Sequence, residues 1–242
     1  MGIRDYGAAT DRLVEAVMKA LSCMLVAVSL LTWTVGNAQG VKKEKVRVAF
    51  VISDGFDVID FAGPWEVFQD VTLGSANDSM DIPYELYTVS SGKGTVTSSG
   101  GARVVPQYTL DDAPRPDLIV IGAQSDNSPA LLAWLGSQHA SRVTIMSVCT
   151  GVRKLALAGL LDGKQATSHH EYLGEFEKKF PQVHWQASRR YVRSDETIYT
   201  AGGLTSGIDL ALHLVAARFG MDVAQKTADY IEYRGDGWKQ AD

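Results

Sequence analysis

The 242-residue sequence has only two cysteines, Cys23 and Cys149. Two thiols are too few for a disulfide framework or a four-thiolate zinc site. The chain also lacks an excess of basic residues, since its formal net charge is −5, so its charge gives no reason to expect nucleic-acid or anionic-membrane binding. With 45% hydrophobic and 21% charged residues it has the composition of a globular protein, and its length suits one domain of about 200 residues.

A hydrophobic run long enough for a typical transmembrane helix, roughly 20 residues, is also lacking. The longest apolar stretch, Ala20–Val35, follows the basic Lys19 and is followed by small residues up to Ala38. This order of a basic start, a short apolar core and a small-residue end is typical of a secretory signal peptide. We therefore predict that residues 1–38 are an N-terminal extension plus signal peptide, with translation starting at Met18. An uncleaved membrane anchor or a buried helix are the alternatives.

Cleavage after Ala38 would leave residues 39–242 as a single domain, and we expect an exported, periplasmic protein without stable membrane association. Cys23 would be removed with the signal, and it lies inside the apolar run rather than at its end, so the lipoprotein pattern is not met. Cys149 would then be the only thiol, and a single cysteine cannot form an internal disulfide. It is therefore either a buried, inert thiol or a reactive one.

Apolar strand-like runs alternate with amphipathic segments from Val46 onward, which predicts an α/β sandwich around a mostly parallel sheet. A glycine- and serine-rich stretch, Ser91–Gly101, predicts a hairpin excursion. The expected strands are Val46–Ile52, Tyr84–Ser90, Asp117–Ile121, Arg142–Val148, Tyr191–Ser194 and Thr197–Ala201. The expected helices are Val58–Val71, Ala130–His139, Gly151–Leu161, Glu171–Phe180, Ser206–Phe219 and Val223–Tyr233.

The sequence Ser147-Val148-Cys149-Thr150-Gly151 lies where a predicted strand meets a predicted helix. This is the layout of a nucleophile elbow, with cysteine in place of serine. The N–H groups of the following helix would lower the pKa of the thiol, and nearby amides would hold a developing negative charge. The alternative is a cysteine that serves as a small core residue.

Asp60 stands between apolar neighbours shortly after the first predicted strand. It could cap the next helix, as aspartate often does. In a parallel sheet, however, this position lies at the carboxyl edge, where ligands gather. A carboxyl group beside the Cys149 thiol would repel the thiolate, so we expect the two groups to share one proton that is available for acid–base work.

Two further segments are expected at the same edge. In Thr167–Glu171, His169 could orient or deprotonate the thiol, or it could be an ordinary histidine at a helix start. We expect no metal there, because adjacent residues point in different directions. In Gly202–Ser206, Gly203 and Thr205 could cap the pocket, or the segment could simply be a glycine-rich turn.

These segments together resemble the ThiJ/PfpI superfamily, the single-domain relatives of class I glutamine amidotransferases. The resemblance covers Val46 to about Tyr233 and rests on VAFVISDGFDVIDFAGPWEVF, DLIVIG, SVCTG, LALAGLLDGKQATSHHEY and AGGLTSGIDLALHLVAARFG. It implies a flavodoxin-like three-layer sandwich with a mostly parallel central sheet and a cysteine nucleophile elbow. It also implies a homodimer.

Within this superfamily, the pattern of Asp60, Cys149 and Thr150 is similar to that of isonitrile hydratases. That similarity implies addition of water to an isonitrile, a small electrophilic molecule, to give an N-substituted formamide without a cofactor. Members commonly have Pro-Gly-Gly where this chain has Gly122-Ala123-Gln124. Backbone amides such as that of Ala123 can still form an oxyanion hole, while Gln124 would add a side chain to the pocket.

Other branches fit less well. Peptidases of the superfamily have histidine directly after the cysteine, where this chain has Thr150. Glyoxalase and deglycase relatives pair the cysteine with a glutamate, replaced here by Asp60, and with a histidine at the position of His169. Regulators of the AraC type need a helix-turn-helix domain that we do not expect here. The remaining alternative is a non-catalytic periplasmic binding or redox-responsive dimer whose thiol oxidises.

Overall fold

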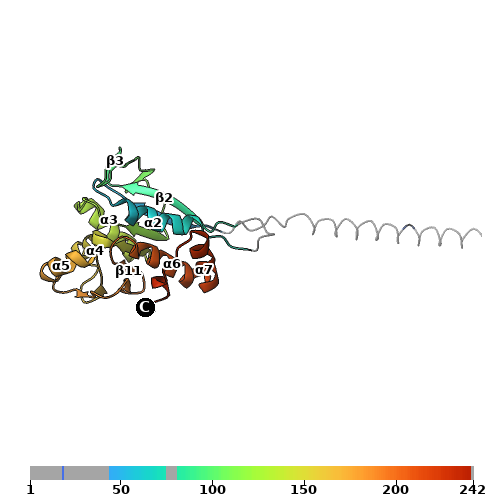
Figure 1. The fold of residues 1–242 in the computed structure, drawn as a ribbon. Helices are drawn as coiled ribbons and strands as arrows, with labels where there is room; N and C mark the ends of the chain where they lie inside the picture. The colour runs from blue at the N-terminus through green and yellow to red at the C-terminus, as the bar shows by residue number, and fades with distance from the viewer. Residues whose placement is uncertain (1–17, 19–43, 75–80, 241–242) are drawn as a thin grey trace, which may run out of the picture. The chain divides into compact units, whose positions relative to one another are not determined.

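The computed structural model describes Met18 and residues 44–74 and 81–240 (Figure 1). The chain divides into two compact units, residues 1–43 and 44–242, and the second holds nearly all the described residues. The predicted signal peptide and its cleavage after Ala38 lie outside the described residues. Among the helices that the structure describes, none has the length and apolar character needed to cross a membrane.

A seven-stranded sheet forms the centre of the second unit, in the order β10-β11-β7-β6-β1-β2-β5. Every neighbouring pair in it is parallel except β10 and β11, which are antiparallel. The sequence-based prediction of a mostly parallel α/β sheet is therefore confirmed. The strands are β1 (Val46–Val51), β2 (Tyr84–Ser90), β5 (Tyr108–Thr109), β6 (Leu118–Ile121), β7 (Thr144–Val148), β10 (Tyr191–Arg193) and β11 (Ile198–Ala201).

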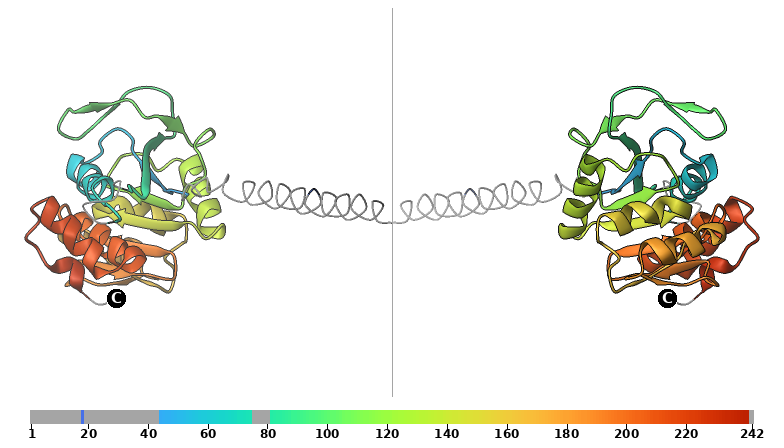
Figure 2. Two further views of the ribbon diagram at one scale, coloured as in Figure 1. Left: turned by 90° about the vertical axis from the view of Figure 1, so that its right-hand side faces the viewer. Right: turned by 90° about the vertical axis from the view of Figure 1, so that its left-hand side faces the viewer.

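Helices cover both faces of this sheet and give the three layers of the sandwich (Figures 1 and 2). The central strands are apolar on both faces, as parallel strands buried by helices must be, and β6 is buried along its whole length. One core forms with α2 (Val58–Gln69), α6 (Ser206–Phe219) and α7 (Met221–Tyr230). The other forms with α3 (Pro129–Ala140), α4 (Val152–Leu157) and α5 (Leu173–Lys179).

Several predicted boundaries differ from the structure. The helix expected over Gly151–Leu161 is a 3₁₀ turn, η1 (Cys149–Gly151), followed by the short α4, and Gly159 then takes a positive φ of 70°. The expected hairpin excursion is present as β3 (Val96–Thr97) and β4 (Arg103–Val104), which pair antiparallel. The two-residue strands β5, β8 (Gln165–Ala166) and β9 (His184–Trp185) were not predicted, because two residues are too few to show a periodic pattern. Two further 3₁₀ turns are η2 (His170–Tyr172) and η3 (Gly237–Lys239).

The strand order determines which segments meet. The adjacent parallel strands β11, β7, β6 and β1 all end at one edge of the sheet. The segments that follow them are Gly202–Ser206, the Cys149 elbow, Gly122–Gln124 and the start of α2. The chemistry-bearing segments expected from the sequence therefore converge at this carboxyl edge, where α/β folds place their ligand sites.

Candidate active site

Cys149 forms a sharp turn between β7 and η1. Its φ is +57°, a left-handed conformation that residues with a side chain seldom adopt, and its side chain is 96% buried. The Cys149 N–H donates to the carbonyl of Gly202 at 2.9 Å, which ties the elbow to the end of β11. Gly151 permits the tight packing behind the turn, because a Cβ there would lie closer than 3.0 Å to the Ile121 carbonyl. This is the geometry of a nucleophile elbow.

Asp60 lies in the first turn of α2 and is only 1% exposed. The residue at the N-cap is Asp57, so the alternative interpretation of Asp60 as a helix cap is wrong. The Ala123 N–H donates to Oδ2 of Asp60 at 3.0 Å, whereas Oδ1 is buried without a hydrogen-bond partner. One carboxylate oxygen is thus held in place by Ala123, and the carboxyl group also faces the Cys149 thiol and the Leu204 N–H.

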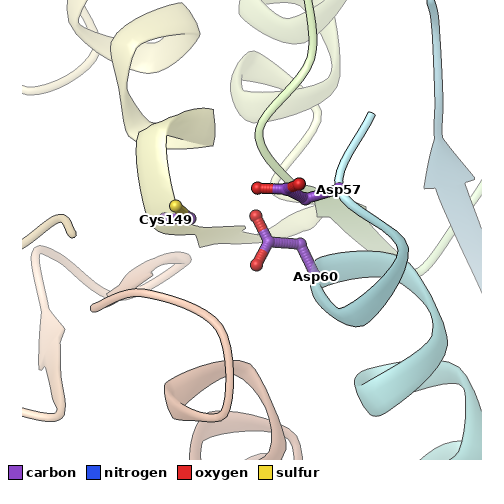
Figure 3. A group of neighbouring side chains, drawn as sticks. All are labelled: Asp57, Asp60 and Cys149. Carbon is purple, nitrogen blue, oxygen red and sulfur yellow. The ribbon is translucent and has the colours of Figure 1, made fainter. Parts of the chain in front are cut away.

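Asp57, Asp60 and Cys149 form one cluster, with ligand atoms that all lie within 4.8 Å of one another (Figure 3). Figure 3 shows both carboxyl groups at the start of α2 facing the sulfur. Asp57 is held by a 3.1 Å bond from its N–H to the Ala123 carbonyl and by the Ser99 hydroxyl, which donates to its Oδ1 at 2.8 Å. Asp57 was not predicted as a site residue; its position three residues before Asp60, on one helical turn, was the available signal.

The protonation of the cluster follows from burial and charge. Burial raises the pKa of Asp60 to about 6, although the Ala123 N–H opposes this change. Burial, followed by the nearby Asp60 carboxylate, raises the pKa of Cys149 to about 12. At neutral pH the carboxylate is therefore ionised and the thiol keeps its proton. The amides of Thr150 and Leu204 lower the pKa of the thiol, as expected for N–H groups near the elbow, but burial and like charge outweigh them and the net change is upward.

Leu204 is a site residue that the sequence analysis missed. Its backbone N–H lowers the pKa of both Cys149 and Asp60, so it faces both groups. Its φ is +54°, and the signal was the surrounding glycine-rich turn rather than the leucine itself. The predicted Gly203 has a different role: a Cβ there would lie closer than 3.0 Å to the His169 ring. The predicted Thr205 accepts a 3.1 Å bond from Arg190 at its hydroxyl.

The predicted oxyanion residues Ala123 and Gln124 are arranged differently from the expectation. The Ala123 N–H already donates to Asp60, so it is not a free donor for a substrate oxygen. The Gln124 side chain is 8% exposed and donates through Nε2 to the Val51 carbonyl at 3.0 Å, so it is packed into the protein rather than added to a pocket wall. Thr150, by contrast, follows the elbow as predicted and turns its backbone N–H toward the sulfur.

His169 lies beside the elbow, between the Ser168 contact to Cys149 and the Gly202–Ser206 segment. The neighbouring Ser168 hydroxyl donates to the Cys149 carbonyl at 3.0 Å, and the His169 ring packs against Gly203. Its Nδ1 accepts from the Glu171 N–H at 3.3 Å, so the neutral ring carries its proton on Nε2. The ring stacks on His170 with centroids 4.5 Å apart. His169 is thus placed at the rim of the site, next to the segment that carries Leu204.

One small cavity lies at the site, and a larger one lies elsewhere in the fold. One, of about 10 Å³, is lined in part by Asp57, Asp60 and Phe61 and is the size of a single water molecule. The other, of about 320 Å³, lies at the opposite edge of the sheet, where it is lined by residues at the starts of the strands, Val46 and Tyr84 among them. The larger cavity is therefore remote from the thiol, and the reactive cluster opens on little free volume.

The donor set of the cluster allows a cation in principle. Asp57, Asp60 and Cys149 are the one group of three potential ligands with suitable spacing in the part of the chain that the structure describes. A thiol and two carboxyl groups in a buried site can equally share protons, as the pKa values of Asp60 and Cys149 indicate.

The fold and the elbow define a class of α/β proteins with a buried cysteine at the carboxyl edge of the sheet. The sequence profile of the DJ-1/PfpI family matches residues 46–217, and the chain belongs to that family.

Among curated proteins it is 31% identical to an isonitrile hydratase of Pseudomonas putida over 193 residues, which is 78% of each chain. It is 30% identical to an HTH-type transcriptional regulator, CdhR, of Pseudomonas aeruginosa, and spans about half of that protein (53%) and 74% of its own length. Among solved structures, a ThiJ/PfpI family protein of Pseudomonas syringae superposes with a TM-score of 0.68 at 27% identity, over 82% of this chain and 79% of the other.

Proposed function

We propose that the protein is a cysteine-dependent enzyme similar to isonitrile hydratase, which adds water to an isonitrile and releases an N-substituted formamide. The observation that carries this proposal is the Cys149 sulfur at the elbow within 4.8 Å of the Asp60 carboxyl group, and the pKa values of about 12 and about 6 put the proton on sulfur and leave Asp60 ionised at pH 7. This pair can transfer a proton as the sulfur attacks. The similarity to an isonitrile hydratase over most of both chains supports the choice of substrate class.

In the first step, Asp60 accepts the proton of the Cys149 thiol while the sulfur bonds to the terminal carbon of the isonitrile. Asp60 then returns that proton to the same carbon, which gives an enzyme-bound thioimidate. The N–H groups of Thr150 and Leu204 face the sulfur and stabilise charge there during the transfer. In this step the S–H bond breaks, and one S–C bond and one C–H bond form.

In the second step, a water molecule adds across the C=N bond of the thioimidate. The oxygen bonds to carbon and a proton reaches nitrogen, again through Asp60. The C–S bond then breaks, a C=O bond forms, and the hydroxyl proton restores the thiol. The products are the formamide and the free enzyme, so one water is consumed per isonitrile and no redox partner is needed.

The test is the hydration of cyclohexyl isocyanide by the purified protein, followed by formamide production. We expect Cys149→Ala and Asp60→Asn each to lower kcat by a factor of at least about 10². We also expect kcat/KM to fall about tenfold for each pH unit below about pH 6, because Asp60 must be ionised to accept the proton. Equal rates for wild type and Cys149→Ala would contradict the mechanism, and an inactive wild type would contradict the substrate class.

A second candidate, action on a reactive carbonyl as in glyoxalase or deglycase enzymes, is favoured by the position of His169 against Gly203 beside the elbow. In that case methylglyoxal is the preferred substrate, and His169→Ala lowers its turnover. The matched control is His170→Ala, since this exposed neighbour stacks on His169 but lies farther along the chain from the elbow. If both histidine variants keep their isonitrile turnover while His169→Ala lowers methylglyoxal turnover, the two proposals are separated.

The regulator relatives raise a third candidate, a non-catalytic dimer with a binding or redox-responsive role. Sensor thiols are exposed and have a low pKa. Cys149 is buried and its pKa is raised, which weighs against oxidation as its principal chemistry.

A further inference from the structure

A lysine is buried directly behind the reactive elbow. Lys154 is the third residue of α4, which begins where η1 ends, and its side chain is only 1% exposed. It is one of the largest fully buried side chains among the described residues. Lysine is seldom buried to this extent, because removal of an ammonium group from water is costly.

The contacts of Lys154 lead to the reacting carboxylate. Its Nζ donates to the Gln124 carbonyl at 2.5 Å. The preceding residue, Ala123, donates its N–H to Asp60 and accepts from the N–H of Asp57. The ammonium therefore bonds to one residue of the 123–124 turn, and the other residue of that turn bonds to the Asp60 carboxylate and to the backbone of Asp57. This turn joins α4 to α2 across the end of β6.

The Lys154 ammonium has three N–H donors, and the acceptor it bonds to, the Gln124 carbonyl, is neutral. Burial lowers the pKa of Lys154 to about 8, and the adjacent Arg153 lowers it further. Asp126 and Cys149 are the groups that oppose this change, so the ammonium would be attracted to a negative charge on the Cys149 sulfur. An apolar side chain of similar volume would fill the same space without the desolvation cost. Fold stability thus gives no reason for a lysine at this position.

We propose that Lys154 is a positioning residue for the reacting pair, which fixes the 123–124 turn that holds Asp60 and supplies a positive charge that favours the Cys149 thiolate. The inference rests on the proposed role of the Cys149–Asp60 pair, whatever the substrate. When Asp60 accepts the thiol proton, the negative charge that remains on sulfur is stabilised by the ammonium. The pKa of Asp126 is lowered and that of Asp60 is about 6, so both carboxylates stay ionised above pH 7, whereas Lys154, with a pKa of about 8, loses its charge between pH 7 and 9.

The test is the rate at which iodoacetamide alkylates Cys149 in the full chain. The thiolate sulfur bonds to the methylene carbon, iodide leaves, and the thiol proton goes to solvent. Trypsin separates a peptide with Cys149 from the one with Cys23, so mass spectrometry follows each thiol alone. We expect Lys154→Met to react at least about 5-fold more slowly than wild type at pH 7, with the two rates converging above pH 9 as the wild-type lysine loses its proton.

Lys164→Met is the matched control. Lys164 is also partly buried and also donates to a backbone carbonyl, that of Leu160 at 2.8 Å, but its ion pair is with Asp195 in the β10–β11 turn. We expect this variant to alkylate at the wild-type rate. A general loosening of the fold would accelerate alkylation in both variants, whereas loss of the positive charge slows it in Lys154→Met alone.

Equal rates for Lys154→Met and wild type at pH 7, with both folded by circular dichroism, would overturn the proposal. If Lys154→Met does not fold, the pH dependence of alkylation in the wild-type protein decides. The logarithm of the Cys149 alkylation rate must rise by less than one unit per pH unit between pH 7 and 9, and a straight line of unit slope would refute the role of the ammonium. Because alkylation needs no isonitrile, a failed hydration assay leaves this result unaffected, and failure here leaves the hydration proposal intact.

Discussion

Cys149 combines a reactive side chain with a strained backbone. Its positive φ of 57° directs the sulfur toward the start of α2, where the two carboxyl groups lie. The residue type and its place between strand and helix are visible in the sequence, so the elbow could be predicted. The net change in the pKa of the thiol could not be predicted, because it depends on the depth of burial and on a carboxylate that lies 89 positions earlier in the chain.

The strain at Cys149 leads to a stability prediction. A non-glycine residue in the left-handed region costs roughly 1–2 kcal/mol, which glycine avoids. We expect Cys149→Gly to be about 1 kcal/mol more stable than Cys149→Ala in urea unfolding, with both variants inactive. Alanine is the matched control because it keeps the Cβ without the sulfur. A Cys149→Gly variant less stable than Cys149→Ala would show that the turn is not strained.

Asp60 makes the stability of the fold depend on pH. Its pKa is about 6 in the folded protein and 3.8 as the ordinary value, so the folded state binds more protons between these values. The unfolding free energy contributed by this group therefore decreases as pH rises from about 4 to 6. We expect Asp60→Asn to raise the unfolding free energy at pH 7 by about 2 kcal/mol and to change it little at pH 4.

The control for this prediction is Glu66→Gln, which removes an exposed carboxylate from the same helix. Urea denaturation at pH 4 and pH 7 would measure all three proteins. A destabilised Asp60→Asn at pH 7 would mean that the carboxylate contributes more to the fold through its bond to Ala123 than it costs by burial.

At the scale of elements, close contacts between segments position the site. η1 crosses the end of β6 so tightly that only a glycine fits at position 151, because any Cβ would meet the Ile121 carbonyl. Long strands and helices such as β2 and α6 could be predicted with their boundaries, since their patterns extend over seven or more residues. The short η1 and α4 could not be separated by sequence, and Leu204 was overlooked because its role depends on its backbone rather than its side chain.

Gly151→Ala tests this contact. We expect the variant to lose at least about 3 kcal/mol of unfolding free energy and its activity, since a clash with backbone cannot be relieved by a rotamer change. The matched control is Gly136→Ala in the middle of α3, where a Cβ meets nothing within 4 Å. That variant should gain up to about 1 kcal/mol, because alanine is the better helix former. Thermal and urea unfolding give both values, and equal effects would contradict the packing argument.

At the scale of the whole molecule, residues 44–242 contain the entire family match and all the site residues. We propose that this unit acts as a homodimer outside the cytoplasm, after removal of the preceding signal peptide. The single thiol that would remain, Cys149, suits an oxidising compartment, because its burial and raised pKa slow its oxidation.

The N-terminus of the processed chain tests this proposal. Expression with the full leader in a Gram-negative host, followed by intact-mass spectrometry of the periplasmic fraction, should give a chain that starts at Gln39. Ala38→Arg, which places a bulky charged residue at the expected cleavage site, should block processing. A chain that still starts at Met1 or Met18 in a cytoplasmic fraction would contradict both export and cleavage.

The sequence alone determined the order of strands and helices, the elbow motif and the pairing of Asp60 with Cys149, because hydrophobic periodicity and short local motifs are written along the chain. Only the tertiary structure added Asp57 and Leu204 to the site, gave Gln124 and Ala123 structural roles, and placed Lys154 behind the thiol. The positions and roles of these five residues depend on which strand ends lie side by side and on how far each charge is removed from water. Distance through space and solvent exposure are properties of the folded chain, and no pattern of neighbouring residues records them.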